Sequence, residues 1–175
     1  RHDRLKRRIR KKGSVFHVMK TFVVIGLGRF GSAVATELSS LGHEVLAVDE
    51  REDHGQRVAE KGTHAVTGDA RDPSVLRALG VRNYDCAVVA VGDDIGNSAL
   101  ITLNLKEIGV KRVICKAQSH VHRKVLEKIG ADRVVFPEQE MALRLARNLA
   151  NGDILNFIEL SEEYSIMECR CPRQW

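Results

Sequence analysis

The 175-residue sequence lacks any long apolar run, and this absence excludes a membrane-spanning helix. Such a helix needs about 18 or more consecutive apolar residues, and no stretch of this chain approaches that length. The basic residues at the N-terminus are also not followed by the apolar segment that a secretory signal peptide requires. We therefore expect a soluble protein that works inside the cell.

Cysteine is scarce as well, with four residues in the whole chain. Cys86 and Cys115 lie inside apolar, strand-like runs, so we expect both to be buried as small hydrophobic side chains. Cys169 and Cys171 stand near the end of the sequence, without a second pair at the spacing of metal ligands. The sequence thus predicts neither a disulfide nor a zinc site.

Positive charge is concentrated at the N-terminus. Residues 1–12 hold eight Lys or Arg and one Asp, a net charge of +7, whereas the whole chain carries +5, so the remaining residues carry −2. Because Met19 precedes the first strand, we interpret residues 1–18 as a basic extension or an expression leftover. A nucleic-acid or membrane-surface role would depend on this segment alone, and we do not expect nucleic acid as a partner.

Apolar runs and helical patterns alternate through the first 150 residues. Strands are predicted at 22–26, 43–49, 64–67, 86–91, 112–117 and 133–136. Helices are predicted at 29–41, 53–61, 119–129 and 140–149. A short helix is predicted to start at Asp72-Pro73, and a long one to follow residues 92–94 and end at residue 108. Six strands separated by helices predict an α/β fold, a Rossmann-like doubly wound parallel six-stranded sheet. Residues 154–160 and 164–167 are predicted to be short extended segments beyond that sheet.

The motif Gly26-Leu27-Gly28-Arg29-Phe30-Gly31 joins the first strand to the first helix. Gly26 permits a tight turn, Gly28 lets a phosphate approach backbone N–H groups, and Gly31 lets the helix pack closely on the sheet. The helix N-terminus then favours the anion. Asp49 ends the second strand, where it can accept hydrogen bonds from ribose hydroxyls and repel a 2′-phosphate. This order of strand, glycines, helix and acid predicts a nucleotide-binding βαβ unit.

Further polar residues fall at the carboxyl ends of the other predicted strands. Arg29 can reach phosphate oxygens with its guanidinium or remain solvated at the helix start. Asp69 can meet the base or serve the turn that follows Gly68. Lys116 can reach phosphates or point to solvent. Carboxyl ends of parallel strands share one edge, so these side chains and residues 91–93 are predicted to line one site.

The chain from residue 20 to about 160 resembles the TrkA-N domain, also called KTN or RCK, the nucleotide-binding regulatory domain of bacterial potassium uptake systems. Within that family it is most similar to Ktr-type regulatory subunits. The resemblance is carried by residues 24–31 (VIGLGRFG), 42–49 (GHEVLAVD), 115–118 (CKAQ) and 125–133 (VLEKIGADR). The last stretch matters most, because no generic dinucleotide fold requires it.

The resemblance implies a regulatory subunit and not an enzyme. It implies binding of ATP/ADP or NAD(H), dimers that build a homo-oligomeric ring as large as an octamer, and an integral-membrane potassium-translocating subunit as partner. The protein would then be cytoplasmic and peripherally associated with the inner face of the cell membrane. Two alternatives stay open, a nicotinamide-dependent oxidoreductase and a nucleotide- or redox-sensing DNA-binding regulator. For the first, nothing after residue 160 supplies a substrate pocket.

The resemblance also implies roles for individual residues. Arg29 would sense a terminal phosphate, across a subunit boundary in the ring. His122 corresponds to a position on the ligand side of the family's domain. Glu138 would help to hold Mg²⁺ or Ca²⁺ against the nucleotide phosphates, although an acid in a first helical turn is already stabilised by the helix dipole. The helix 140–149 is either a subunit contact or the domain's own last covering helix.

The expected nucleotide contacts follow the carboxyl edge of the predicted sheet. They are Gly26, Gly28, Arg29, Phe30, Gly31, Asp49, Glu50, Arg51, Asp69, Ala70, Val91, Gly92, Asp93, Lys116, Ala117, Gln118, His122 and Glu138. We divide the chain into the basic extension 1–18, a nucleotide-binding domain at 19–150 and a crossover segment with a tail at 151–175. The family's second, C-terminal subdomain has no match in this sequence, and residues 161–175 carry no family motif.

Overall fold

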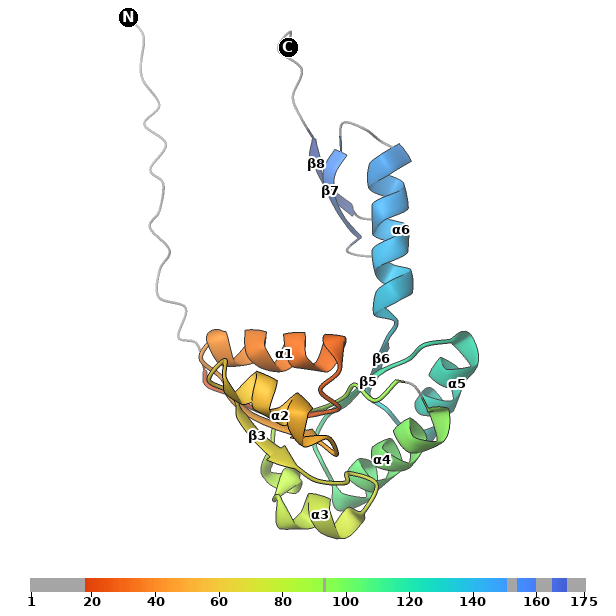
Figure 1. The fold of residues 1–175 in the computed structure, drawn as a ribbon. Coiled ribbons are helices and arrows are strands. Elements are labelled where there is room, and N and C mark those ends of the chain that lie inside the picture. The colour runs from red at the N-terminus through yellow and green to blue at the C-terminus, as the bar shows by residue number, and fades with distance from the viewer. Residues whose placement is uncertain (1–17, 93, 151–153, 160–164, 170–175) are drawn as a thin grey trace, which may run out of the picture.

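The computed structural model describes residues 18–92 and 94–150, together with the strands at 154–159 and 165–169. Its centre is a sheet of six parallel strands with helices on both faces (Figure 1). The strands are β1 (Thr21–Ile25), β2 (Glu44–Asp49), β3 (His64–Thr67), β4 (Cys86–Val89), β5 (Val113–Lys116) and β6 (Arg133–Val135). Their order across the sheet is β3-β2-β1-β4-β5-β6, and every neighbouring pair is parallel. The predicted Rossmann-like doubly wound fold is confirmed.

Helices follow the strands as the sequence predicts. They are α1 (Arg29–Ser40), α2 (Glu52–Ala59), α3 (Pro73–Ala78), α4 (Ile95–Ile108), α5 (His120–Ile129) and α6 (Pro137–Ala150). The short 3₁₀ helix η1 (Val81–Asn83) was not predicted. The side chains of Asp72, Asp94 and Ser119 accept N–H groups at the starts of α3, α4 and α5. Within the described residues, no helix combines the length and the apolar content that a membrane crossing needs.

The core lies on both faces of the sheet because strand side chains alternate in direction. Val23 and Ile25 of β1 pack with side chains of α3, α4 and α5, whereas Val24 packs with side chains of α1 and α2. All four residues of β4 are buried, as expected for a strand covered on both faces. Cys86 and Cys115 are buried free cysteines, as predicted. Burial raises the pKa of Cys115 to about 11, so its thiol stays protonated at neutral pH.

Several element boundaries differ from the sequence prediction. β4 ends at Val89, two residues early, because the chain leaves the sheet after the Ala90 N–H donates to the Ile25 carbonyl. α6 begins three residues early, at Pro137, since the Glu140 carboxylate accepts the Phe136 N–H at the helix start. The two extended segments become β7 (Ile154–Glu159) and β8 (Ser165–Cys169), which pair antiparallel with each other outside the main sheet. The predicted domain limits remain predictions.

Helix α6 leads away from the sheet, with β7 and β8 beside it (Figure 1). None of its fourteen residues, all of which the structure describes, is buried. Met141, Leu143, Leu145 and Leu149 are between 51% and 75% exposed. The alternative in which this helix covers the domain's own core is therefore wrong.

A hydrogen-bonded carboxylate joins β5 to the turn before β6. The Asp132 carboxylate accepts the Val113 N–H at 2.7 Å and lies 3.0 Å from the Lys106 ammonium. Burial opposes ionisation of Asp132, but these two donors outweigh it and lower the pKa of the carboxyl group. Asp132 belongs to the 125–133 stretch of the sequence, so part of that motif serves to fix the edge of the sheet.

We predict that Gly31→Ala destabilises the protein by about 1–3 kcal/mol, the usual cost of overpacking. A methyl group on Gly31 would collide with the carbonyl oxygen of Gly26. Gly28→Ala is the matched control in the same loop, because a Cβ on Gly28 meets nothing within 4 Å and its φ of −66° suits alanine. Urea unfolding should show a clear loss in the free energy of unfolding for Gly31→Ala. For Gly28→Ala the free energy of unfolding should change by no more than about 0.5 kcal/mol. Equal stabilities would contradict the close packing of α1.

We predict that Asp132→Asn destabilises the protein at pH 7 and that this difference narrows on acidification. A carboxylate whose folded pKa lies below its unfolded value of about 3.9 stabilises the fold above that value. The stabilisation is lost as the pH falls through the lower folded pKa. Urea unfolding of both proteins between pH 7 and pH 3 measures this trend. A difference that stays constant over the whole range would show that the Asp132 charge contributes nothing.

Candidate functional site

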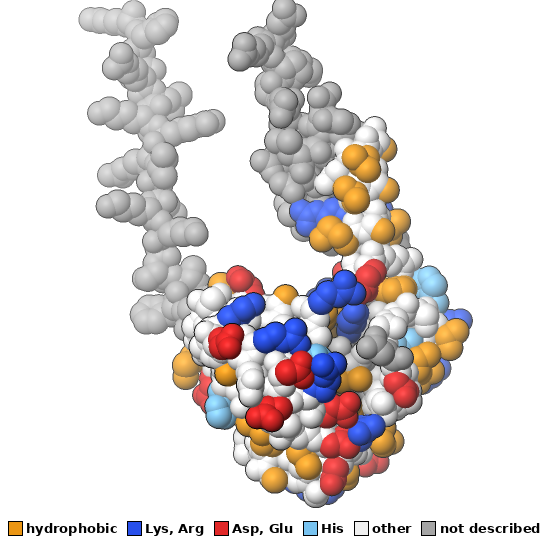
Figure 2. Space-filling model, in the orientation of Figure 1, with side chains coloured by type: hydrophobic (Ala, Val, Ile, Leu, Met, Phe, Trp, Pro, Cys, Tyr) orange, Lys and Arg blue, Asp and Glu red, His pale blue; other side chains and the backbone are white. Residues whose placement is uncertain are grey.

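A cavity of about 980 Å³ opens at the carboxyl edge of the sheet. Fourteen predicted site residues line it: Gly26, Gly28, Arg29, Phe30, Asp49, Glu50, Arg51, Asp69, Ala70, Val91, Gly92, Lys116, Gln118 and Glu138. Basic and acidic side chains lie side by side on the face of the molecule below α6 (Figure 2). The volume is in the upper part of the range of small-molecule sites, about 300–1,000 Å³.

The glycine loop forms the centre of this cavity. Gly26 has a φ of +90°, and a Cβ there would lie 2.9 Å from Val91 Cγ2, so both the turn and the close packing require glycine. Gly28 is the N-cap residue of α1 and has open space where a side chain would stand. The first N–H groups of a helix have no partner within the helix, so this open space faces donors suited to an anion.

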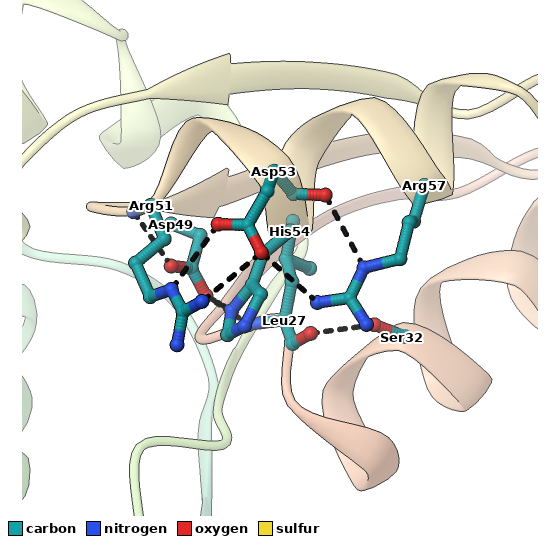
Figure 3. Close-up of polar contacts among 7 residues, drawn as sticks. All are labelled: Leu27, Ser32, Asp49, Arg51, Asp53, His54 and Arg57. Atoms are coloured by element: carbon teal, nitrogen blue, oxygen red, sulfur yellow. Dashed lines mark hydrogen bonds and ion pairs between the residues drawn. The ribbon is translucent and has the colours of Figure 1, made fainter.

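Asp49 holds the glycine loop against the end of β2 (Figure 3). Its carboxylate accepts the Leu27 N–H at 2.6 Å and the Arg51 N–H at 2.8 Å, and His54 Nδ1 lies 3.1 Å away. Only 9% of the side chain is exposed. A carboxylate oxygen accepts two hydrogen bonds, and Oδ1 is given one here, so Asp49 retains capacity for one more donor. The ribose contact of Asp49 stays a prediction.

Arg51 pairs with a carboxylate at the rim of the cavity (Figure 3). Its guanidinium donates to both oxygens of Asp53, at 3.1 and 3.0 Å. Arg57, one turn further along α2, also lies 3.6 Å from Asp53. The hydrogen bond from Arg51 lowers the pKa of Asp53. The positive charge of Arg51 is therefore offset beside the place predicted for the ribose.

At the end of β3, Asp69 is engaged by a residue that the sequence did not single out. The Arg71 side chain donates from Nε and Nη2 to the two oxygens of Asp69, both at 2.8 Å. The backbone N–H of Arg71 donates to the same carboxylate at 2.9 Å. These hydrogen bonds lower the pKa of Asp69. Whether Asp69 meets a base stays a prediction, but the structure shows it as the partner of Arg71.

Lys116 and Glu138 form an ion pair at the opposite end of the cavity. Lys116 Nζ lies 2.8 Å from Glu138 Oε1 and 5.7 Å from the ring centroid of Phe30. The Lys116 side chain is 13% exposed, so the alternative in which it points to solvent is wrong. The hydrogen bond from Lys116 lowers the pKa of Glu138. The described residues contain no group of three possible metal ligands, so the cation contact of Glu138 remains a prediction.

Three predicted residues do not line the cavity. His122 is fully buried, and its Nδ1 accepts the Gln118 N–H at 3.4 Å, so it supports a cavity residue from behind and does not face the ligand side as expected. Burial also lowers the pKa of His122. Ala117 is buried, and Gly31 has the packing role described above. Asp93 lies outside the described residues.

Sequence reasoning missed nine residues that complete the cavity wall: Ile25, Val48, Gly68, Ala90, His54, Arg71, Asp94, Asn97 and Ile101. The first four continue strands or turns beside predicted contacts, and the order of strands could have indicated them. Asp94 caps α4, the helix that follows β4, and Asn97 lies in its first turn, so this is a further helix start at the same edge. Nothing in the sequence pattern indicated His54 or Arg71.

The sequence is similar to one family of known proteins. A family model described as the TrkA-N domain matches residues 22–137. Ktr system potassium uptake protein A of Bacillus subtilis is 47% identical over 155 residues, 89% of this chain and 70% of that protein. Ktr system potassium uptake protein C of the same bacterium is 50% identical over 149 residues, 85% of this chain and 67% of that protein.

A solved structure supports the fold. The NAD(P)-binding domain of an exopolyphosphatase-related protein from Archaeoglobus fulgidus matches with a TM-score of 0.67. The match covers 75% of this chain and 98% of that one, at 23% sequence identity. This likeness adds to the evidence for the Rossmann-like fold.

We predict that Asp49→Asn destabilises the protein by about 1–3 kcal/mol, the cost of leaving a buried polar group unpaired. The amide has one oxygen, so its NH₂ group would face either the Leu27 or the Arg51 N–H. Asp53→Asn is the matched control. The Asp53 carboxylate is 57% exposed, so this variant should lose less stability. Urea unfolding compares the two variants. A larger loss for Asp53→Asn would contradict the anchoring role of Asp49.

Proposed function

Because the chain belongs to the TrkA-N domain family, we propose that it is a nucleotide-binding regulatory subunit of a potassium uptake system. It binds an adenosine-containing ligand, ATP/ADP or NAD(H), in the carboxyl-edge cavity and performs no catalysis. The proposal rests above all on that cavity, which unites the glycine loop with Asp49 and Lys116. The chain that forms this cavity is 47% identical to Ktr system potassium uptake protein A and 50% identical to protein C.

The distribution of charge supports one orientation of the ligand. Gly28 and the N-terminus of α1 lie in the middle of the cavity wall, and Lys116 adds positive charge on the β5 side. Asp49 ends β2 and Asp69 follows β3 on the other side. Phosphates fit the first side and a ribose with its base fits the second. The open space at Gly28 has room for the anion.

The exposed apolar side chains of α6 support association with a second copy of the chain. Met141, Leu145 and Leu149 recur at helical spacing, so they share one face of the helix. A face of this kind, on a helix none of whose residues is buried, suits a symmetric contact. We propose that dimers formed in this way build the ring that contacts an integral-membrane potassium-translocating subunit. The protein then lies at the cytoplasmic face of the membrane.

The Lys116–Glu138 pair connects the cavity to the first turn of α6. A phosphate that draws Lys116 toward itself releases Glu138, whose carboxylate is then free to join Mg²⁺ or Ca²⁺ at the phosphates. A nucleotide shifts the ring only if it binds one arrangement more tightly than another. A tenfold preference at each site corresponds to about 1.4 kcal/mol, and several sites in a ring multiply the effect.

Titration of the protein with ATP, ADP and NADH, each with and without Mg²⁺, tests ligand binding. We expect saturable binding with a clear order of affinities in calorimetry. Gly28→Ala should weaken the preferred ligand at least tenfold while the protein stays folded, because its methyl group would occupy the space of the phosphate. Absence of binding to all three ligands, or unchanged binding by Gly28→Ala, would overturn the assignment of this cavity.

Restoration of potassium uptake tests the cellular role. The gene should restore growth at limiting potassium in a bacterium that lacks its own Ktr regulatory subunit. Gly28→Ala is the matched control and should fail to restore growth at equal protein level. Failure of the unaltered chain, expressed at the level of the missing subunit, would contradict the proposed role in potassium uptake.

We predict that Glu138→Gln removes the effect of Mg²⁺ on ATP binding. Metal-free binding should be unchanged or tighter, because Lys116 no longer has a carboxylate partner that competes with phosphate. Glu140→Gln, two residues further along the same helix, is the control and should keep the Mg²⁺ effect. Isothermal titrations of the three proteins give the comparison. A Mg²⁺ dependence that survives in Glu138→Gln would leave Glu138 as a simple partner of Lys116.

A further inference from the structure

Arg71 lines the cavity next to the end of β3, and the proposed function so far gives it no role. Its position is at one extreme of the site, because β3 is the edge strand and Lys116 lies at the end of β5, beyond β2, β1 and β4. Phosphates fit the side of Lys116 and the glycine loop. A ligand that extends along the strand ends therefore brings its base toward Arg71.

The edge of the Arg71 guanidinium is engaged by two carboxylates. Nε and Nη2 donate to the two oxygens of Asp69 at 2.8 Å each, and Nη2 lies 3.2 Å from Glu50 Oε2. The backbone is fixed as well, since Asn104 of α4 donates its side-chain N–H to the Arg71 carbonyl at 2.9 Å. Asn104 is 7% exposed, so this anchor belongs to the packed interior. Arg71 is held at both its backbone and its side chain.

This arrangement makes Arg71 a poor ligand for phosphate. Two carboxylates offset its charge, and a phosphate that approached it would also approach Glu50 and Asp69. The flat faces of a guanidinium remain usable when its edge is hydrogen-bonded, and they stack well on aromatic rings. Ile101, one turn before Asn104 on α4, is 3% exposed and lines the same cavity. A cavity wall that offers both an apolar side chain and a fixed planar cation suits a purine ring.

On the premise that the cavity binds a nucleotide, we propose that the base of that nucleotide stacks on the guanidinium of Arg71. Asp69 is then a positioning residue that orients Arg71, and its contact with the base runs through that side chain. Arg71 is the residue that distinguishes a nucleotide from a bare polyphosphate at this site.

Binding of ADP and of tripolyphosphate to four proteins tests this proposal. The proteins are the unaltered chain, Arg71→Ala, Arg71→Lys and Asp69→Asn, and the readout is the dissociation constant of each probe by calorimetry. Stacking predicts that Arg71→Ala weakens ADP binding roughly 5- to 100-fold, the range for loss of one base–side-chain stack. Tripolyphosphate binding should change less than about twofold, which also shows that the variant is folded. Arg71→Lys keeps the charge but not the plane, so it should lose as much ADP affinity as Arg71→Ala.

The double variant Arg71→Ala/Asp69→Asn separates positioning from direct contact. If Asp69 acts through Arg71, the double variant binds ADP as weakly as Arg71→Ala alone, because the two losses are not independent. Additive losses would overturn the positioning role of Asp69. Full ADP affinity in Arg71→Lys or in Arg71→Ala would overturn the stacking role of Arg71. If the unaltered chain binds tripolyphosphate but not ADP, or binds neither, the nucleotide assignment itself fails.

Discussion

The hydrogen bond from the Leu27 N–H to Asp49, 2.6 Å long, ties the glycine loop to the end of the neighbouring strand. The Gly26 N–H also donates to the Val48 carbonyl at 2.8 Å, so two hydrogen bonds hold the loop between β1 and α1 against the end of β2. The same carboxylate accepts the Arg51 N–H and so also sets the start of α2. Gly31 then lets α1 approach the Gly26 carbonyl closely enough for the helix N-terminus to face the cavity. One buried acid thus places the donors on which anion binding depends.

The cavity built on this loop has two unlike ends. At the β5 end, Lys116 is shielded from water, lies near Phe30 and is paired with Glu138 of α6. At the β3 end, Arg71 is offset by Asp69 and Glu50. The first end suits phosphate and connects to the projecting helix, whereas the second suits a base and is anchored to α4 through Asn104. We infer that ligand identity is recognised at one end and that occupancy is transmitted from the other.

Much of the fold could be predicted from the sequence because strand burial and helix caps are local signals. The run 86–91 indicated a doubly covered strand, and Asp72 before Pro73 indicated a helix start. The site was harder, because its wall depends on which side chains pair across the sheet edge. Arg71 was identified as a site residue only from its two side-chain hydrogen bonds to Asp69. His122 was placed on the ligand side by resemblance, but the packing of α5 buries it. Both outcomes depend on tertiary contacts that no sequence pattern encodes.

The structure of the protein with ADP bound tests this account most directly. We expect the diphosphate against the backbone of residues 28–30 and near Lys116, with the ribose at Asp49 and the base on the face of Arg71. ADP bound in the opposite direction, with its base beside Lys116, would contradict the assignment of the two ends. ADP bound outside the carboxyl-edge cavity would contradict the account as a whole.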